Sequence, residues 1–190
     1  MWQVMTHLNP MANDLEGFCN DLMSLSDGKS VLSRHYDHKT GKMSKSSQIG
    51  SNDFIIASGL HALYLPVLRD CYNLKIYLDI DEGLRRHFKL KRDVLQRGHS
   101  VKQVLGSLEK REPDSERFIR PQSRHADLIL SVQPIHPRMI GDLGDKHPLL
   151  LKLVVNTRNG FNELSIHRVL VGVCGLRVDI VAGNDGADVQ

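Results

Sequence analysis

Three short apolar stretches alternate with helix-type stretches along the chain, and this order constrains the fold more than any other sequence feature. The apolar stretches are "DFIIAS" at 53–58, "LKIYLDI" at 74–80 and "DLILSV" at 127–132. Runs of this kind are typical of strands that are buried on both faces of a parallel sheet. Because strands that alternate with helices favour a parallel arrangement, we predict an α/β fold in which helices flank a parallel sheet.

The helix-type stretches carry start and stop signals. Residues 13–28 place apolar side chains at helical spacing, with Asn13 or Asp14 as the expected N-cap and a glycine at the end. Residues 81–98 form a basic stretch that opens with acidic residues and also ends in glycine, which predicts a second helix. Residues 33–52 are rich in Ser, Lys and Gly and are predicted to form a long loop.

The chain is predicted to contain one main domain and part of another. A length of 190 residues suits one domain, or one domain with a small addition. After about residue 147 the sequence becomes rich in Val and Leu and contains the turn-like "RNG" and "GNDG". We predict a main domain at residues 1–147 and a partial, β-rich appendage at 148–190.

Composition limits the classes of partner. The formal net charge is only +3, which gives no strong electrostatic footprint for nucleic acid. The three cysteines are far apart in the sequence, which favours a reducing compartment. The first residues have no basic and apolar leader pattern, and the apolar run "PLLLKLVV" is too short to span a bilayer. We predict a soluble cytoplasmic protein without a membrane partner.

Two short motifs imitate nucleotide-binding signatures. "KMSKS" at 42–46 matches a signature of class I aminoacyl-tRNA synthetases, but no H-x-G-H motif occurs in the 41 residues before Lys42. "DGKS" at 27–30 imitates the end of a P-loop, but the required leading glycine would fall at Met23. We interpret the first as a solvated loop and the second as the end of a helix.

A third stretch, "RHYDH", suggests metal ligands. It brings His35, Asp37 and His38 within four residues of one another. These three side chains cannot easily face one ion without a fourth ligand from elsewhere, and no histidine pair has i, i+4 spacing on a convincing helix face. We predict no metal site.

The basic stretch "LRRHFKLKRDVLQRGHS" carries the strongest local signal. It can be a solvated helix face, or its cations can clamp an anion. Arginine forks match phosphate oxygens bidentately, and such a clamp offsets charge on a moving phosphoryl group. In the functional interpretation the clamp is Lys89, Arg92 and Arg97, and Asp93 either holds an arginine in place or assists with magnesium.

Five stretches together carry a more specific signal than any single motif. They are "LNPMAND", "YDHKTGK", "IIASGLHALY", "LKIYLDIDEGLRRHFKLKRDVLQRGHS" and "REPDSERFIRPQSRHADLIL". In this order and spacing, residues 6–136 resemble the phosphoribulokinase/uridine kinase family of P-loop kinases. The resemblance also explains "KMSKS" as an accidental match within the family's substrate loop.

The resemblance implies roles for the residues that match family motifs. In that family "R-D-x-x-x-R-G" belongs to a mobile lid over the phosphates, and the "Y-D-H" loop belongs to the acceptor site. The implied residues are Arg92 and Asp93 for catalysis, Lys89, Arg92 and Arg97 for the phosphates under the lid, and Tyr36, His38 and His61 for substrate binding. We therefore expect the two arginines to line a cleft with Tyr36 and His38.

The resemblance further implies ATP and Mg²⁺ as cofactors, and transfer of the γ-phosphoryl group to a ribosyl or ribulosyl hydroxyl. The family's P-loop and its acidic catalytic base have no counterpart within residues 1–190, so we expect this chain alone to be inactive. We expect either a fragment or a misplaced start. Ser58, His99 and Ser107 depart from residues that are common in uridine kinases, which weakens uridine as the acceptor.

The resemblance also predicts an incomplete sheet. In the family the P-loop strand lies between the strands that resemble 53–58 and 74–80. Without it, two apolar strand edges would face a gap, and unpaired buried backbone is costly.

Other functions stay open from the sequence. The chain could be a non-catalytic module that binds an anion or a nucleotide, or an RNA-binding fragment that uses the basic helix. A homo-oligomer is also possible. A small ribosyl or sugar-phosphate substrate is the expected partner of the kinase.

Overall fold

The computed structural model describes residues 5–33, 36–37, 42–43, 46–141, 143–144, 147–157, 163–175 and 177. The chain divides into two compact units, Met1–Asn156 and Thr157–Gln190. None of the helices among these residues is long and apolar enough to cross a membrane.

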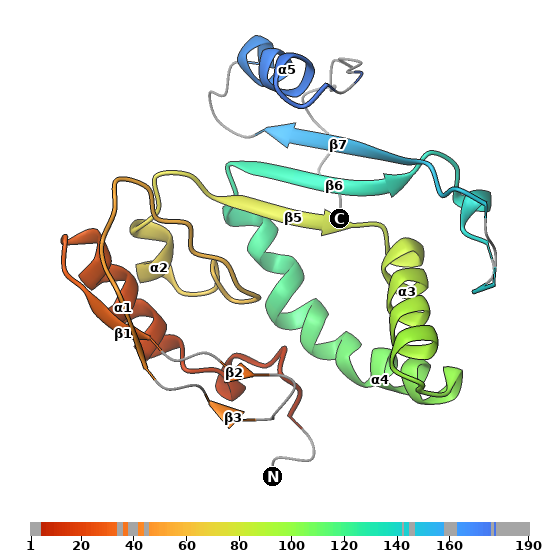
Figure 1. The fold of residues 1–190 in the computed structure, drawn as a ribbon, viewed down its shortest axis with the longest axis horizontal. Coiled ribbons are helices and arrows are strands. Elements are labelled where there is room, and N and C mark those ends of the chain that lie inside the picture. The colour runs from red at the N-terminus through yellow and green to blue at the C-terminus, as the bar shows by residue number, and fades with distance from the viewer. Residues whose placement is uncertain are drawn as a thin grey trace. The chain divides into compact units, whose positions relative to one another are not determined.

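The first unit is built on a mixed three-stranded sheet with the order β5-β6-β7 (Figure 1). β5 (Ile76–Ile80) and β6 (Leu128–Pro134) are parallel, with Ile80 opposite Val132. β7 (Leu151–Thr157) lies on the other edge of β6 and runs antiparallel to it. The α/β prediction is confirmed, and so are the strands expected at 74–80 and 127–132.

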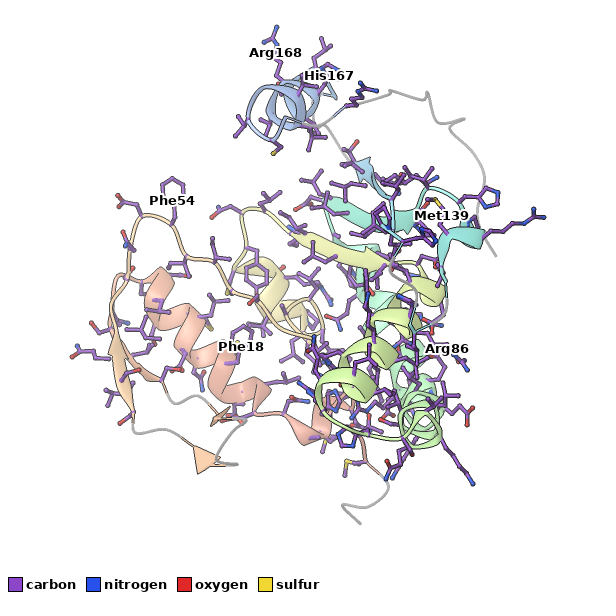
Figure 2. The ribbon with its side chains drawn as sticks, turned by 45° about the vertical axis from the view of Figure 1, so that its right-hand side comes forward. Phe18, Phe54, Arg86, Met139, His167 and Arg168 are labelled. Carbon is purple, nitrogen blue, oxygen red and sulfur yellow. The ribbon has the colours of Figure 1, made fainter. Side chains whose placement is uncertain are left out.

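The strand predicted at 53–58 is wrong for the described structure. This stretch is extended but pairs with no strand, and Phe54 and Ile56 are 90% and 94% exposed; Figure 2 shows Phe54 pointing away from the ribbon. A strand persists only where a neighbour takes up its backbone hydrogen bonds. Among the described residues β5 pairs only with β6, so its other edge has no partner strand. Its Leu78 is 76% exposed.

The N-terminal helices form the main apolar core. A short 3₁₀ turn, η1 (Pro10–Ala12), precedes α1 (Leu15–Ser26). The Asp14 side chain caps α1 by accepting a hydrogen bond from the Gly17 amide, as the sequence predicts. Buried Cys19 and Leu22 on α1 pack against Leu68 of α2 (Pro66–Asp70).

The segment predicted as a loop at 33–52 contains short strands. β1 (Val31–Ser33) pairs antiparallel with β4 (Ser47–Ile49), and β2 (Tyr36–Asp37) pairs antiparallel with β3 (Lys42–Met43). The prediction of loop alone is therefore corrected. Antiparallel pairing is made by backbone groups, so it does not need the apolar side chains on which the prediction relied.

A helical hairpin connects β5 with β6. α3 (Glu82–Leu90) leads away from the end of β5 and continues into η2 (Lys91–Gln96), a π-helical turn. α4 (Val101–Asp114) returns toward the start of β6 and continues through η3 (Ser115–Ile119) and η4 (Arg120–His125). The predicted helix at 81–98 is thus confirmed.

The tip of the hairpin has a defined turn. Gly98 adopts a φ of 71°, a left-handed conformation that favours glycine. Ser100 and Gln103 then form a capping box at the start of α4. These local signals fix where the chain reverses.

The C-terminal region contains both a strand and a helix. η5 (Pro137–Met139) lies in the connection from β6 to β7, and β7 belongs to the main sheet. In the second unit the described residues contain α5 (Glu163–Gly172), so the β-rich character expected after residue 147 holds for β7 but not for α5.

Buried Gln122 ties the segment around His61 to the end of the hairpin. Its Nε2 donates to the carbonyls of Leu60 (2.9 Å) and Phe118 (2.7 Å). Its Oε1 accepts from the Leu63 amide at 3.0 Å. One amide side chain thereby fixes the backbone on both sides of His61.

We predict that Gln122→Leu destabilises the fold. A leucine keeps the volume but leaves these three backbone groups without their partner, which should cost about 3 kcal/mol. Urea denaturation measures the free energy of unfolding, and the exposed Gln96→Leu is the matched control. Equal loss in both variants would contradict the role of Gln122.

Candidate functional site

A buried carboxylate, that of Asp93 in η2, holds three cations. Asp93 is only 5% exposed. Its Oδ2 accepts from Lys89 Nζ at 2.9 Å, and its Oδ1 accepts from Arg92 Nε at 2.8 Å and Arg97 Nη1 at 3.1 Å. We call these four residues the Asp93 cluster. It contains all the residues that the sequence assigned to the phosphates and the lid.

Local geometry brings the Asp93 cluster together. Lys89, Asp93 and Arg97 follow one another at i, i+4 spacing, so they lie on one helix face. The π-helical turn widens the helix at this point, and such turns are frequent at functional sites. The His99 amide donates to the Asp93 carbonyl at 3.0 Å and closes the turn.

The electrostatics of Asp93 favour a holding role. The hydrogen bond from Arg92 is the main cause that keeps the pKa of the Asp93 carboxyl far below its ordinary value, with Lys89 adding to it and burial opposing it. A carboxylate held so firmly as an anion is a weak proton acceptor. It can instead orient the two arginines, whose side chains stay about half-exposed.

His61 is a buried imidazole without a hydrogen-bond partner. The residue is 4% exposed, and neither Nδ1 nor Nε2 has a partner among the described residues. Burial lowers the pKa of the ring, so it is neutral at physiological pH. The His7 backbone acts in the opposite direction and raises the pKa of the ring, but burial is the larger cause; the His7 carbonyl also accepts a hydrogen bond from Asn13 Nδ2 at 3.1 Å.

Two residues that the sequence did not single out lie next to this site. Burial lowers the pKa of His7, and the charges of Arg111, Lys89 and His61 lower it further. Arg111 is partly buried, and burial lowers its pKa. His7 is therefore near enough to Arg111, Lys89 and His61 for their charges to act on its ring. No local sequence pattern marks His7, while Arg111 belongs to a stretch that carried the family resemblance.

The Thr6 hydroxyl anchors the His7 segment. Thr6 Oγ1 donates to Asp114 Oδ2 at 2.6 Å, although the two residues are 108 positions apart in the sequence. Asp114 ends α4, so this bond fixes the N-terminal segment against the helix that carries Arg111. Contacts at such a separation leave no sequence signature.

The expected cleft with Tyr36 and His38 cannot be placed. His38 and the side chain of Tyr36 lie outside the described residues. Their role in the acceptor site stays a prediction, as do the individual roles of the Asp93 cluster. Among the described residues no three His, Cys, Asp or Glu side chains group together as metal ligands.

The base of the hairpin is held by a network of ion pairs. Arg85 on α3 pairs with Glu82 at 2.7 Å and with Glu112 on α4 at 3.2 Å. Arg120 also pairs with Glu112. This network joins α3 to α4 at the base of the hairpin.

Comparison with known proteins decides the family. Residues 2–137 match the model of the Phosphoribulokinase / Uridine kinase family. The chain belongs to this family. It is 33% identical over 141 residues to a phosphoribulokinase from Synechocystis, covering 74% of this chain and 42% of that protein. It is 36% identical over 124 residues to a uridine kinase from Staphylococcus epidermidis, covering 64% of this chain and 60% of that protein.

A solved phosphoribulokinase structure from Rhodobacter spheroides has the same fold. The TM-score is 0.66 at 17% identity, and the match covers 88% of this chain and 64% of that chain. The chain therefore spans less than two thirds of the length of the relatives it matches. The family membership inferred from the five sequence stretches is confirmed.

We predict that Asp93→Asn destabilises the fold by about 3 kcal/mol at neutral pH, because three cations lose their anion. Since folding lowers the pKa of this carboxyl, its contribution is complete above the ordinary aspartate pKa and is lost as the pH falls below it. The difference between the variant and the parent should therefore shrink in acid. Urea denaturation at neutral and acidic pH measures this.

Asp70→Asn is the matched control, because Asp70 is exposed and outside the cluster. A change within about 0.5 kcal/mol is expected for a surface substitution of this kind. A loss for Asp93→Asn that does not depend on pH would contradict the electrostatic explanation.

Proposed function

We propose that this chain supplies the lid and acceptor parts of an ATP-dependent kinase that phosphorylates a ribosyl or ribulosyl hydroxyl. The observation that carries the proposal is the Asp93 cluster, which gathers three cations around one buried carboxylate. Phosphoryl transfer depends mainly on positioning and on offsetting negative charge. A fixed group of cations suits that chemistry.

The arginines keep donors free for phosphate oxygens. Each guanidinium has five N–H donors, and only Nε of Arg92 and Nη1 of Arg97 are bonded to Asp93. The remaining donors of these half-exposed side chains can bind two phosphate oxygens at once. Asp93 holds both forks in place, which reduces the entropy lost on binding.

The described residues fit the phosphates of ATP better than Mg²⁺. The free guanidinium donors suit phosphate oxygens, and Arg92 and Arg97 would hold them. Both oxygens of Asp93 already accept bonds from cations, so this carboxylate is a poor magnesium ligand. When bound, Mg²⁺ would offset negative charge on the phosphates; among the described residues no group of three His, Cys, Asp or Glu side chains would hold it.

A second candidate is a non-catalytic module that binds anions. The conformation of "DGKS" favours this candidate. Gly28 has a φ of 81° just after the end of α1, so this stretch terminates a helix, as predicted, and does not form a phosphate-binding loop. The RNA-binding alternative has less support, because the cations of the Asp93 cluster face one carboxylate rather than forming an open basic stripe.

Several finer assignments belong to this proposal. The acceptor hydroxyl would lie near His61, Tyr36 and His38. The unpaired cysteines support a reducing compartment such as the cytoplasm. The boundary between a main domain at residues 1–147 and an appendage at 148–190, and assembly into homo-oligomers, are part of the same hypothesis.

We predict no turnover by the 190-residue chain alone. The sequence has no GxxxxGK[ST] loop to bind the β- and γ-phosphates, and a missing general base alone costs about 10²–10⁴ in rate. The assay combines the purified chain, ATP, Mg²⁺ and uridine, cytidine or ribulose 5-phosphate. Product above the no-enzyme control that disappears with Arg92→Ala would contradict the prediction.

We also predict weak, salt-sensitive ATP binding that depends on the lid. Arg97→Ala should lower ATP affinity about tenfold, because a charge-assisted bidentate contact is lost. Arg86→Ala is the control, since Arg86 is exposed on α3, as Figure 2 shows. Calorimetry at low ionic strength measures both variants. Equal affinity for ATP in the parent and in Arg97→Ala would refute the lid assignment.

A further inference from the structure

The imidazole of His61 has no hydrogen bond to fix its orientation. The residue is 4% exposed, and neither ring nitrogen has a partner among the described residues. The last side-chain torsion of a histidine is soft, so a ring without hydrogen bonds keeps its orientation only through packing. The residues that pack against His61 therefore decide where its two nitrogens point.

Three aromatic rings form a row that leads to His61. The His61 and Tyr64 rings meet edge to face, with centroids 5.7 Å apart and planes at 74°. The Tyr64 ring meets the Phe118 ring in the same way, at 6.1 Å and 75°. Edge-to-face pairs are a favoured arrangement of aromatic side chains. Phe118 belongs to η3, so this aromatic row (His61, Tyr64 and Phe118) starts at the end of the hairpin.

Hydrogen bonds from Gln122 follow the same route. Gln122 lies in η4 and is 5% exposed. Its Nε2 donates to the Phe118 carbonyl at 2.7 Å and to the Leu60 carbonyl at 2.9 Å, and its Oε1 accepts from the Leu63 amide. One side chain thus joins the backbone that carries the Phe118 ring to the residue before His61. Ring contacts and hydrogen bonds therefore give two separate connections from the hairpin to His61.

The turn that carries His61 is also held by α2. Arg69 Nη1 donates to the carbonyls of Leu63 at 3.1 Å and Tyr64 at 2.9 Å. Within the turn, the Tyr64 amide donates to the His61 carbonyl at 3.0 Å. Because the backbone of the turn is fixed in this way, the direction of the His61 ring depends on its contact with Tyr64.

We propose that Gln122 and Tyr64 are positioning residues for phosphoryl transfer: Gln122 sets the place of the His61 backbone, and Tyr64 sets the direction of its imidazole toward the acceptor. The inference rests on the proposed function for the acceptor-side role of His61. The orientation of the ring itself follows from the contacts. Phe118 completes the arrangement, because it holds Tyr64 against the end of the hairpin.

This arrangement joins the phosphate side of the site to the acceptor side through one element. The hairpin carries the Asp93 cluster near its tip and continues through α4 into η3 and η4, where Phe118 and Gln122 lie. A shift of the hairpin end would displace both the ring partner and the backbone anchor of His61. A misplacement of about 1 Å can cost roughly 10²-fold in rate, so positioning contacts of this kind matter for the chemistry.

The first test follows the His61 ring by NMR in the 190-residue chain without ligands, with His61→Gln to assign its signals. Burial holds the pKa of His61 below its ordinary value, and His7 is the titratable neighbour whose ring its charge affects. Tyr64→Leu should shift the His61 signals and raise this pKa toward the ordinary value, because water reaches a ring that has lost its packing. Tyr64→Phe keeps the aromatic contact and should leave both unchanged. A loss of stability alone does not alter the pKa of the folded state, so this measurement separates positioning from structural support.

Phe118→Leu and Gln122→Met test the connection to the hairpin. Each variant removes one of the two connections, so each should shift the His61 ring signals. Phe88→Leu and Gln96→Met are the matched controls, because both residues are exposed on the same hairpin. The controls should leave the His61 signals where they are in the parent chain.

Unchanged His61 signals and an unchanged His61 pKa in folded Tyr64→Leu and Gln122→Met would overturn the proposal. If these variants do not fold, the parent chain decides. Nuclear Overhauser contacts between the His61 and Tyr64 rings are expected there, because the rings meet edge to face. Their absence would refute the positioning role.

A binding measurement distinguishes this inference from the proposed function. Uridine and ribulose 5-phosphate are titrated by calorimetry into the parent chain, Tyr64→Leu and Tyr64→Phe. The acceptor that binds should lose about tenfold in affinity in Tyr64→Leu, because the misdirected His61 ring no longer makes its hydrogen bond, and less than about twofold in Tyr64→Phe. Binding that Tyr64→Leu leaves unchanged would contradict the positioning role while the kinase proposal stands. His61 signals that respond to Tyr64→Leu, with neither acceptor binding, would support the positioning of the ring and count against the kinase proposal.

Discussion

The organisation of the hairpin depends on one buried carboxylate. Asp93 is almost inaccessible to water, so it can remain an anion only because Lys89, Arg92 and Arg97 surround it. These three cations come from the last turn of α3, from the π-helical turn and from the position before Gly98. Their bonds to Asp93 therefore fix the three parts of the chain relative to one another. The same requirement keeps two arginines partly exposed with free donors. Stability and the anion binding that we propose therefore have the same physical source at this point.

Two acids near the end of α4 make contacts outside the Asp93 cluster. Glu112 is used in the ion pairs at the base of the hairpin, and Asp114 holds the N-terminal segment through Thr6. Arg111 precedes both in the sequence and forms no ion pair with a carboxylate of the described residues, although the charge of Asp93 acts on it. The local electrostatic field therefore depends on which partners the acidic side chains bind. The net charge of the chain is only +3 and contributes little to it.

Features made by residues close together in the sequence were easier to predict than contacts between distant residues. The Asp93 cluster is made by residues within nine positions, so the basic stretch and the family motif named its members, and the structure shows that they meet at one carboxylate. The strands at β5 and β6 were also recognisable from their composition. By contrast, the bond from Thr6 to Asp114 spans 108 positions, and nothing in the local sequence indicates His7. The apolar stretch 53–58 failed as a strand because a strand needs a partner as well as a composition.

The unpaired stretch 53–58 is expected to influence the position of His61 more than that of the Asp93 cluster. The Asp93 cluster forms within residues 89–97 and makes no hydrogen bond to 53–58. His61 follows that stretch closely in the chain, and Gln122 fixes the backbone only from Leu60 onward. Exposed Phe54 and Ile56 lie just before this anchor. Any strand that pairs with 53–58 would therefore act first on the position of His61, while the cations held by Asp93 would stay as they are.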